Sequence, residues 1–434
     1  MHDVRLGPTV AGHFLERCSR FHVRAAVDGE PVLAHLPNSG RLHELLHPGA
    51  LVRLAPRPRP DRRTAYDLVL VARPGEAGDG GCDGAERSEP APAAPASAAP
   101  RWAAVDARLP PRLVAAAAAR GLLPVLAGHE LVAREPKLGT GRADLLFRGP
   151  DGLVLVEAKS ITLVDGGVAL FPDSPTSRGA RHLAALAARR DLRRLVVFVV
   201  GRDDARVVRP NTPVDRAFGA AFRAALRAGV EAAGLRCGVD AEGVTALARI
   251  PVETYDPSAP VSPLPDHVRA GLRLLVVGLN PGHYSAWHRG YFARPGNRFW
   301  PAMRAARIVP TWAGPGSEAW CCRTLGIGFT DVVKRPTRSI EELAPTEWAV
   351  GAERLRELVR RYRPRAVLFV GLHGARAVLG RAVEPGRAAV ELEGSAVFVL
   401  PSTSGRQATY RSNAIAAAAR ELARWLASPE GGEP

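Results

Sequence analysis

A short proline-rich segment past the middle of the chain is the feature that most limits its architecture. Residues 256–266 contain four prolines in eleven residues, and proline lacks the amide hydrogen that helix interiors and central strands require. On both sides of this segment, apolar strand patterns alternate with helical ones. We therefore predict that 255–268 is a linker between separately folded parts. A length of 434 residues agrees, because domains commonly have about 100–200 residues.

The rest of the chain divides into four regions by pattern. Residues 1–75 predict a small β domain of short strands with an Asp-Gly hairpin turn. Residues 76–100 are mostly Gly, Glu, Ser, Ala and Pro, which predicts a low-complexity insert without a core. Residues 101–254 and 269–430 predict α/β domains, the second with a doubly wound parallel sheet. The expected strands are 23–27, 31–35, 51–54, 153–156, 195–200, 272–278, 366–371 and 396–401, and the expected helices include 113–120 and 217–233.

The excess of basic residues indicates a polyanionic partner. The formal net charge of +16 favours nucleic acid. A skewed genome is the alternative, because only Lys137, Lys159 and Lys334 are lysines among the 59 basic residues. Such a skew explains the choice of arginine over lysine, but not the excess of charge. It also makes each remaining lysine a candidate for a chemical role.

Membrane and secreted proteins are disfavoured. No apolar run approaches the ~20 residues that span a bilayer, and the first residues lack a signal-peptide pattern. The five cysteines include no Cys-x-x-Cys pair, so a structural zinc site is not expected. We expect a cytoplasmic, nucleoid-associated protein, and the sequence leaves its oligomeric state open.

Two acids and a lysine lie on a predicted hairpin in the third region. A turn at 149–152 would place Asp144 directly opposite Glu157 on the neighbouring strand. Lys159 follows two residues later, on the same strand face as Glu157. Adjacent carboxylates repel each other, and Mg²⁺ prefers such oxygen ligands. This Asp…Glu-x-Lys arrangement is that of metal-dependent nucleases, with a solvated strand face as the alternative.

The motifs around this hairpin resemble the sugar fermentation stimulation protein A family over about 1–254. They are, in order, Leu-Pro-Asn-Ser-Gly-Arg at 36–41, Arg-Ala-Asp at 142–144, Glu-Ala-Lys-Ser at 157–160, Phe-Pro-Asp at 171–173 and Arg-Gly-Ala-Arg-His at 178–182. The resemblance implies an N-terminal oligonucleotide-binding barrel and a restriction-endonuclease-like domain that binds DNA.

Four further residues of this half are candidates for nucleic-acid contact. Arg178 and His182 share a helix face if 176–190 is helical, and they would then contact phosphate. A surface helix with a capping histidine is the alternative. Asn38 and Arg41 lie in a glycine-containing loop, where a plain turn role competes with nucleic-acid binding.

An asparagine follows directly on the strand expected at 272–278. The motif Gly-Leu-Asn-Pro-Gly occupies 278–282, and doubly wound sheets bind ligands at the carboxyl ends of their strands. The glycine spacing does not fit a phosphate-binding loop, and Pro281 removes an amide that such a loop would use. Asn280 can instead hold a water molecule for attack.

Aromatic and small residues form two further motifs. Segments 291–292 and 297–300 interleave aromatic rings with polar and basic residues, which suits base stacking and phosphate contact. A packed aromatic core is the alternative for Phe299 and Trp300. The loop at 401–406 is rich in small residues, which let a backbone approach a duplex, and it ends in an arginine that can enter the base stack.

These pieces resemble the mismatch-specific uracil/thymine DNA glycosylase family over about 266–430. The resemblance implies that Asn280 positions the attacking water, that Phe292 stacks on the flipped base, and that the end of the 401–406 loop fills the gap left in the duplex. The remaining candidates are Gly278 and Gly282 for base binding, and Asn297, Arg298, Ser404, Gly405 and Arg406 for DNA binding.

These features predict a DNA repair protein. The second half is expected to excise uracil or thymine from G·U or G·T mispairs by base flipping, without a cofactor. No lysine is placed for a Schiff base, so we expect no strand cleavage there, and Lys334 should contact phosphate or solvent. The first half is expected to bind DNA, with RNA as an alternative, and to cut it with Mg²⁺ held by Asp144 and Glu157. A non-catalytic DNA-binding regulator of sugar metabolism fused to a glycosylase is the competing hypothesis.

Overall fold

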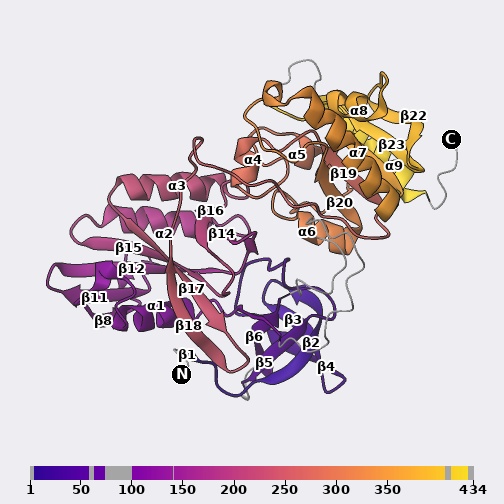
Figure 1. Cartoon of the computed structure of the whole chain (residues 1–434). Helices are drawn as coiled ribbons and strands as arrows, with labels where there is room; N and C mark the ends of the chain where they lie inside the picture. Colours follow the sequence, from indigo (N-terminus) through magenta and orange to yellow (C-terminus); the bar gives the residue numbers. More distant parts are fainter. Residues whose placement is uncertain (1–3, 58–62, 74–99, 140, 406–411, 429–434) are drawn as a thin grey trace. The chain divides into compact units, whose positions relative to one another are not determined.

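The computed structural model separates the chain into two compact units (Figure 1). One unit consists of residues 1–76 and 95–254, and the other contains 255–434. The described residues are 4–57, 63–73, 100–139, 141–405 and 412–428. Nearly all of the predicted insert lies outside them, and so does Arg406.

The first unit contains a closed β-barrel. Its sheet has the order β4-β3-β2-β5-β6-β7, and a further pairing of β4 with β6 closes it. Asp28 and Gly29 both have positive φ, as a two-residue hairpin turn requires, so the predicted turn is confirmed. The strands are β2 (Val10–Ser19), β3 (His22–Val27), β4 (Glu30–His35), β5 (Leu51–Pro56), β6 (Tyr66–Ala72) and β7 (Trp102–Ala104). The insert therefore connects two neighbouring antiparallel strands, β6 and β7.

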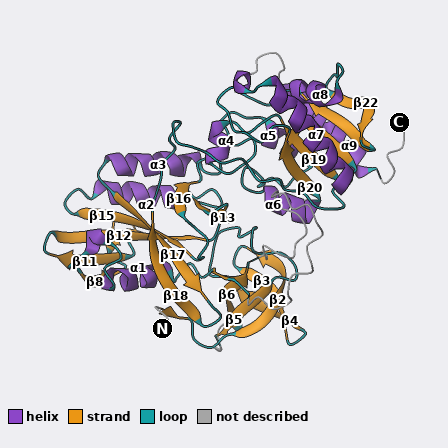
Figure 2. Ribbon diagram, viewed as in Figure 1, coloured by secondary structure: helices purple, strands orange, loops and turns teal. Residues whose placement is uncertain are grey.

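A seven-stranded mixed sheet forms the other part of this unit, in the order β1-β18-β17-β15-β12-β11-β8. Helix α1 packs against the side chains on one face of this sheet, and α2 and α3 pack against those on the opposite face. Helices therefore cover both faces of the sheet (Figure 2). The strands are β1 (Val4–Arg5), β8 (Glu130–Arg134), β11 (Leu145–Gly149), β12 (Gly152–Ile161), β15 (Arg193–Val200), β17 (Glu231–Val239) and β18 (Gly243–Ile250). The helices are α1 (Pro110–Ala119), α2 (Ser177–Ala188) and α3 (Arg216–Arg227).

Short elements complete the unit. They are β9 (Lys137–Leu138) paired with β10 (Gly141–Arg142), and β13 (Val164–Asp165), β14 (Val168–Phe171) and β16 (Val207–Pro210) in a three-stranded sheet.

One expected helix is shorter than predicted. The pattern at 217–233 predicts helix throughout, but α3 ends at Arg227 and β17 begins at Glu231. Gly229 lies between them with φ of 83°, a left-handed conformation that ends helices and favours glycine. The residues beyond it pair with β15 instead, because pairing in the sheet outweighs their helical pattern.

The second unit is a three-layer α/β/α domain, as predicted. Its sheet has the order β20-β19-β21-β23-β22, with β22 alone antiparallel. Leu274 and Val276 pack with α5 and α9, whereas Leu275 and Val277 pack with α7 and α8. The strands are β19 (Leu274–Gly278), β20 (Ile327–Asp331), β21 (Ala366–Val370), β22 (Gly386–Leu392) and β23 (Ser395–Leu400). The helices are α4 (His283–Trp287), α5 (Phe299–Ala305), α6 (Glu318–Trp320), α7 (Pro345–Tyr362), α8 (Leu372–Leu379) and α9 (Ser412–Ala427).

The proline-rich segment belongs to this second unit. Leu264 is buried in its core, and the carbonyl of Pro265 accepts a hydrogen bond of 3.0 Å from the Tyr291 hydroxyl. His267 forms an isolated bridge with Phe329 in β20. Across the described residues of both units, no helix is long and apolar enough to cross a membrane.

Gly351 lets α7 pack closely on the residues that follow β20. A β-carbon there would lie well inside van der Waals distance of the Val332 carbonyl oxygen, which is backbone and cannot move aside cheaply. We expect Gly351→Ala to lower the free energy of unfolding by about 1–3 kcal/mol, despite the better helix propensity of alanine. Urea denaturation measures this change. Val350→Ala, at a residue that is 70% exposed, is the control, and equal effects of both substitutions would contradict the close contact.

Candidate functional site

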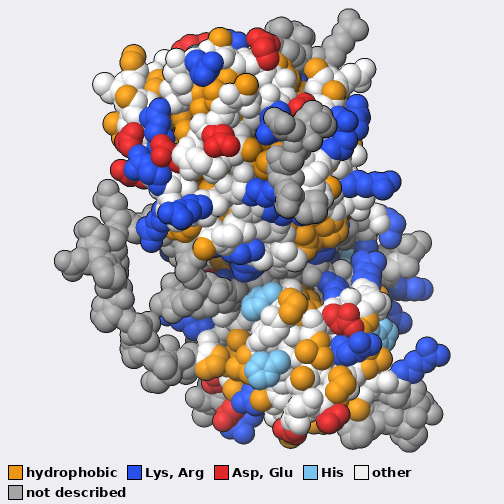
Figure 3. Space-filling view, turned by 90° about the vertical axis from the view of Figure 1, so that its right-hand side faces the viewer, with side chains coloured by type: hydrophobic (Ala, Val, Ile, Leu, Met, Phe, Trp, Pro, Cys, Tyr) orange, Lys and Arg blue, Asp and Glu red, His pale blue; other side chains and the backbone are white. Residues whose placement is uncertain are grey.

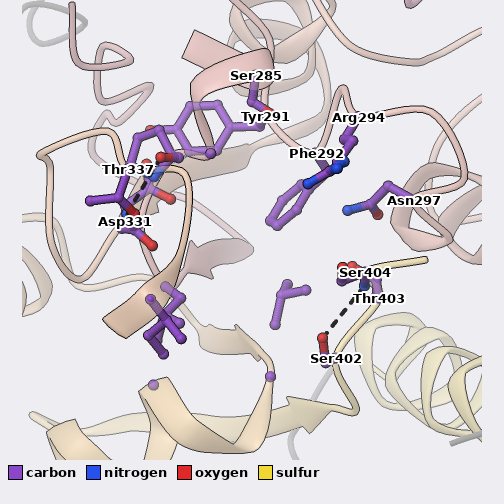
Figure 4. A pocket seen from close by; sticks show the side chains of 18 of the residues that line it. Ser285, Tyr291, Phe292, Arg294, Asn297, Asp331, Thr337, Ser402, Thr403 and Ser404 are labelled. Atoms are coloured by element: carbon purple, nitrogen blue, oxygen red, sulfur yellow. Dashed lines mark hydrogen bonds between the residues drawn. The ribbon is translucent and has the colours of Figure 1, made fainter. Parts of the chain in front are cut away.

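A cavity of about 440 Å³ lies at the carboxyl ends of β19, β20, β21 and β23. This is the end of the sheet at which the sequence predicts a ligand site. Figure 4 shows Asp331 on one side of the space, with Phe292 and Asn297 on another. The predicted residues that line the cavity are Asn280, Gly282, Phe292, Asn297 and Ser404.

Asn280 is held by the loop that follows β20. Its side-chain NH₂ group donates to the Thr337 hydroxyl at 2.7 Å and to the Arg335 carbonyl at 3.1 Å. The backbone reinforces this contact, because Gly282 and Thr337 form an isolated bridge. The Asn280 amide oxygen makes neither of these bonds. It is therefore the atom left to accept a hydrogen bond from a water molecule.

Asp331, which the sequence analysis did not single out, ends β20 and faces the same cavity. It pairs in register with Gly278 at the end of β19, where a β-carbon would overlap a carboxylate oxygen of Asp331. Gly278 thus lets the carboxyl group occupy the strand end, although it does not itself line the cavity. Burial raises the pKa of Asp331 to about 7. At neutral pH about half of the Asp331 carboxyl groups are therefore ionised and able to accept a proton.

Lys334 lies inside a polar cluster behind Asp331. Its ammonium donates to the Asp266 carboxylate at 2.6 Å and to the Tyr291 hydroxyl at 3.2 Å. The Lys334 side chain is 24% exposed, so it reaches solvent as expected, but its ammonium is held mainly by Asp266. The physical reason is that the largely covered Asp266 carboxylate requires a cation, which Lys334 supplies.

Phe292 presents its ring to the cavity, as Figure 4 shows. Its φ of 55° is unusual for a residue other than glycine, and its ring centroid lies 4.2 Å from that of Phe299. Phe299 and Trp300 are buried, so the core alternative holds for these two. Phe292 thus rests on a packed aromatic base and is half-buried.

The loop after β23 is fastened to the loop before α5. The Arg298 guanidinium donates to the carbonyls of Ser402 and Ser404 at 3.4 and 3.2 Å, and its backbone amide donates to Thr403. A β-carbon on Gly405 would lie 3.1 Å from the Gly296 carbonyl oxygen. Arg298 therefore positions the loop that carries the predicted duplex contacts.

The predicted hairpin of the first unit has the expected register. Leu145 pairs with Val156, and Gly149 pairs with Gly152. At the end of this ladder, a carboxylate oxygen of Asp144 accepts the amide of Ala158 at 2.6 Å. Asp144 thus lies against the strand that carries Glu157, as predicted.

Glu157 is the centre of a buried ionic cluster. One of its carboxylate oxygens accepts Lys159 Nζ at 2.5 Å and His182 Nδ1 at 2.7 Å. Arg178 Nε donates to His182 Nε2 at 3.3 Å, so Nδ1 carries the proton donated to Glu157. The predicted helix face is thereby confirmed, and it places His182 beside Glu157.

The two carboxyl groups differ in pKa. Burial and the charge of Glu157 raise the pKa of Asp144 to about 6. Burial also acts on Glu157, but the bonds from His182 and Lys159 outweigh it and lower its pKa. Asp144 therefore takes up a proton first as the pH falls.

The residues around Asp144 and Glu157 would suit a hard divalent cation. Glu157 Oε2 is buried without a hydrogen-bond partner in the structure, and only one oxygen of Asp144 is used by Ala158. A cation would relieve the repulsion that raises the pKa of Asp144. Within the described ranges, however, no three His, Cys, Asp or Glu side chains form a metal cluster. A cation here would thus need backbone or water oxygens as further ligands.

Asn38 and Arg41 lie in the loop between β4 and β5 of the barrel, which contacts the residues after β7 and after β14. The Asn38 side chain donates to the Val105 carbonyl at 2.8 Å and accepts from the Gly40 amide. The amide of Arg41 donates to the Asp173 carboxylate at 2.7 Å. These bonds support the turn role for Asn38. On the face shown in Figure 3, Lys and Arg side chains are spread over the surface instead of forming one patch.

The first unit combines an oligonucleotide-binding-type barrel with a restriction-endonuclease-like sheet, and the second is a three-layer glycosylase-type domain. Together these parts define a DNA repair protein whose partner is DNA. Family models agree: the SfsA N-terminal OB domain matches residues 15–77, and the sugar fermentation stimulation protein RE domain matches 108–243. The uracil DNA glycosylase superfamily model matches 265–424.

Similar proteins cover the first half. The sugar fermentation stimulation protein homolog of Moorella thermoacetica is 42% identical over 245 residues, 55% of this chain and 94% of that protein. The Chloroflexus aurantiacus homolog is 39% identical over 249 residues, 56% of this chain and 86% of that protein. A structure of Pyrococcus furiosus SfsA in complex with Ca²⁺ is 26% identical, covers 58% of this chain and 99% of that one, and has a TM-score of 0.49.

The chain belongs to the sugar fermentation stimulation protein family and carries a uracil DNA glycosylase superfamily domain behind that part. Both resemblances drawn from the sequence are thus confirmed. Sequence reasoning missed Asp331 and Asp266. For Asp331 a signal existed, because it closes the short stretch Ile-Gly-Phe-Thr at 327–330 as a polar residue, much as Asn280 follows the strand expected at 272–278.

Proposed function

We propose that the second unit is a monofunctional glycosylase that removes uracil or thymine from G·U or G·T mispairs. The observation that carries this proposal is the convergence of Asn280 and Asp331 on one cavity at the strand ends. A base flipped from the duplex would enter this cavity and stack on Phe292. The fastened loop at 401–405 would approach the duplex, and Arg406 would fill the gap.

Each side chain has a distinct task in base release. Asn280 is fixed by Thr337 and Arg335, so its amide oxygen holds the water in one orientation. Asp331 in its ionised form takes a proton from this water as its oxygen attacks the sugar carbon. The bond between that carbon and the base breaks, and the base leaves with the bonding electrons and takes up a proton from solvent, while Asp331 returns its proton to solvent. The products are a free base and an abasic site, and no cofactor is required.

We expect Asn280→Ala to slow base release by about 100-fold or more, because a preorganised polar group acting in the transition state is lost. Duplex affinity should change little, since the interaction is made with the water. Single-turnover assays on G·U and G·T duplexes, read after alkali, measure the rate. Asn413→Ala, at an exposed position of α9, is the control. An unchanged rate in Asn280→Ala would remove Asn280 from the mechanism.

The rate of base release should rise with pH through about 7, where the Asp331 carboxyl ionises. Only the ionised form accepts a proton, so at one pH unit below the pKa the rate should be about tenfold lower than its plateau. Asp331→Asn should lower the plateau by about 100-fold and remove this pH dependence. A rate that falls with rising pH through 7 would show that the protonated form acts instead.

A second proposed function is metal-dependent cleavage of nucleic acid by the first unit. It is favoured by the hydrogen bonds that gather Asp144, Lys159 and His182 around the strand of buried Glu157. Asp144 and Glu157 would hold Mg²⁺, which would supply charge stabilisation at a phosphate. Lys159 would orient an attacking water, and His182 keeps Glu157 ionised. The non-catalytic regulator stays the competing hypothesis for this half, and RNA the alternative substrate.

EDTA should abolish strand cleavage but leave base release unchanged, and Asp144→Asn should act like EDTA. Because Asp144 has a pKa of about 6, Mn²⁺ binding should weaken as the pH falls below 6. Calorimetry with Mn²⁺ and gel assays without alkali measure the two effects. Asp151→Asn, in the exposed hairpin turn, is the matched control. Breaks that persist in EDTA and in Asp144→Asn would contradict the metal site.

A further inference from the structure

Asp266 ends the proline-rich segment and is largely covered by the second unit, with 12% of its side chain exposed. Its carboxylate accepts hydrogen bonds from the Thr330 hydroxyl at 2.7 Å, Lys334 Nζ at 2.6 Å and the Arg354 guanidinium at 2.8 Å. These bonds lower its pKa although burial opposes them. Asp266 is therefore ionised at neutral pH and does not line the cavity.

The Lys334 ammonium lies between two carboxyl groups and is closer to that of Asp266 than to that of Asp331. It is 2.6 Å from an oxygen of Asp266 but 3.8 Å from Asp331 Oδ2. Asp331 Oδ2 is buried without a hydrogen-bond partner in the structure. Asp266 thus draws the cation away from the carboxyl group that faces the pocket.

Two further polar groups, those of Arg354 and Tyr291, lie near both Asp266 and Asp331. Arg354 of α7 donates one NH₂ group to Asp266 and the other to Thr330 and the backbone carbonyl of Asp331. The Tyr291 hydroxyl accepts a hydrogen bond from Lys334 Nζ and donates one to the Pro265 carbonyl. Burial and the charge of Asp266 raise the pKa of Asp331, whereas the charges of Lys334 and Arg354 and a hydrogen bond with Tyr291 lower it.

We propose that Asp266 is a positioning residue of the glycosylase pocket. It holds Lys334 and Arg354 away from the Asp331 side chain, and it thereby sets how readily Asp331 takes up a proton. This inference rests on the proposed function of the pocket. Asp266 does not line the cavity, and it acts through Lys334. Because it is the last residue of the proline-rich segment, that segment contributes to the site.

The experiment compares the full-length protein with Asp266→Asn. Without the Asp266 charge, Lys334 can approach Asp331, so the midpoint of Asp331 ionisation should fall by about one pH unit or more. The rise in base release with pH should move down by the same amount, with KM little changed. Carboxyl ¹³C NMR, assigned with Asp331→Asn, measures the midpoint directly. Asp256→Asn, an exposed acid of the same segment, is the matched control.

Two further variants separate electrostatics from folding. Asp266→Glu keeps the charge and should restore most of the wild-type profile. Lys334→Gln removes the cation and should move the Asp331 midpoint upward, opposite to Asp266→Asn. A purely structural role predicts loss of stability in these variants with no ordered shift of the midpoint.

The outcomes are distinguishable from those of the proposed function. If wild type releases no base but the midpoint shifts as expected, the glycosylase proposal fails and the positioning role stands. If wild type releases base but Asp266→Asn and Lys334→Gln leave the midpoint unchanged, the positioning role is overturned.

Discussion

A buried carboxylate needs a positive partner, and both sites of this protein depend on that requirement. In the first unit Lys159 bonds Glu157 at 2.5 Å, and in the second Lys334 bonds Asp266 at 2.6 Å. In each case a second carboxyl group, Asp144 or Asp331, lies close by with a raised pKa. The lysine therefore neutralises one acid and leaves its neighbour reactive. This division of charge leaves one carboxyl group of each pair with a raised pKa, and that group is the one the proposed chemistry uses.

The scarcity of lysine in the sequence anticipated part of this arrangement. Two of the three lysines, Lys159 and Lys334, lie in these clusters, where a compact ammonium fits between buried oxygens. The hairpin register and the position of Asn280 at a strand end were predictable, since both follow from local patterns and from the rule that ligands bind where parallel strands end. The three-layer order of the second unit was predictable because strand and helix patterns alternate along it.

Contacts between distant segments account for what the sequence did not reveal. Lys334 meets Asp266, 68 residues away, and His182 meets Glu157, 25 residues away. No local spacing encodes such pairs, because they depend on how helices and loops pack on a sheet. The early end of α3 has a related cause. The helical pattern continues past Arg227, but Gly229 and pairing with β15 decide the structure.

Proline suits the segment before the second unit because of what it lacks. A proline has no amide hydrogen to satisfy when it packs against a surface, but its carbonyl still accepts. The carbonyls of Pro257, Pro263 and Pro265 each accept a hydrogen bond from a side chain of this unit. The segment therefore follows the unit closely, without forming a strand or a helix, and delivers Asp266 to the cluster behind the pocket. A proline-rich stretch between two domains can thus be a structural part of the one that follows it, and here the fixed path of the chain places a charge where the chemistry uses it.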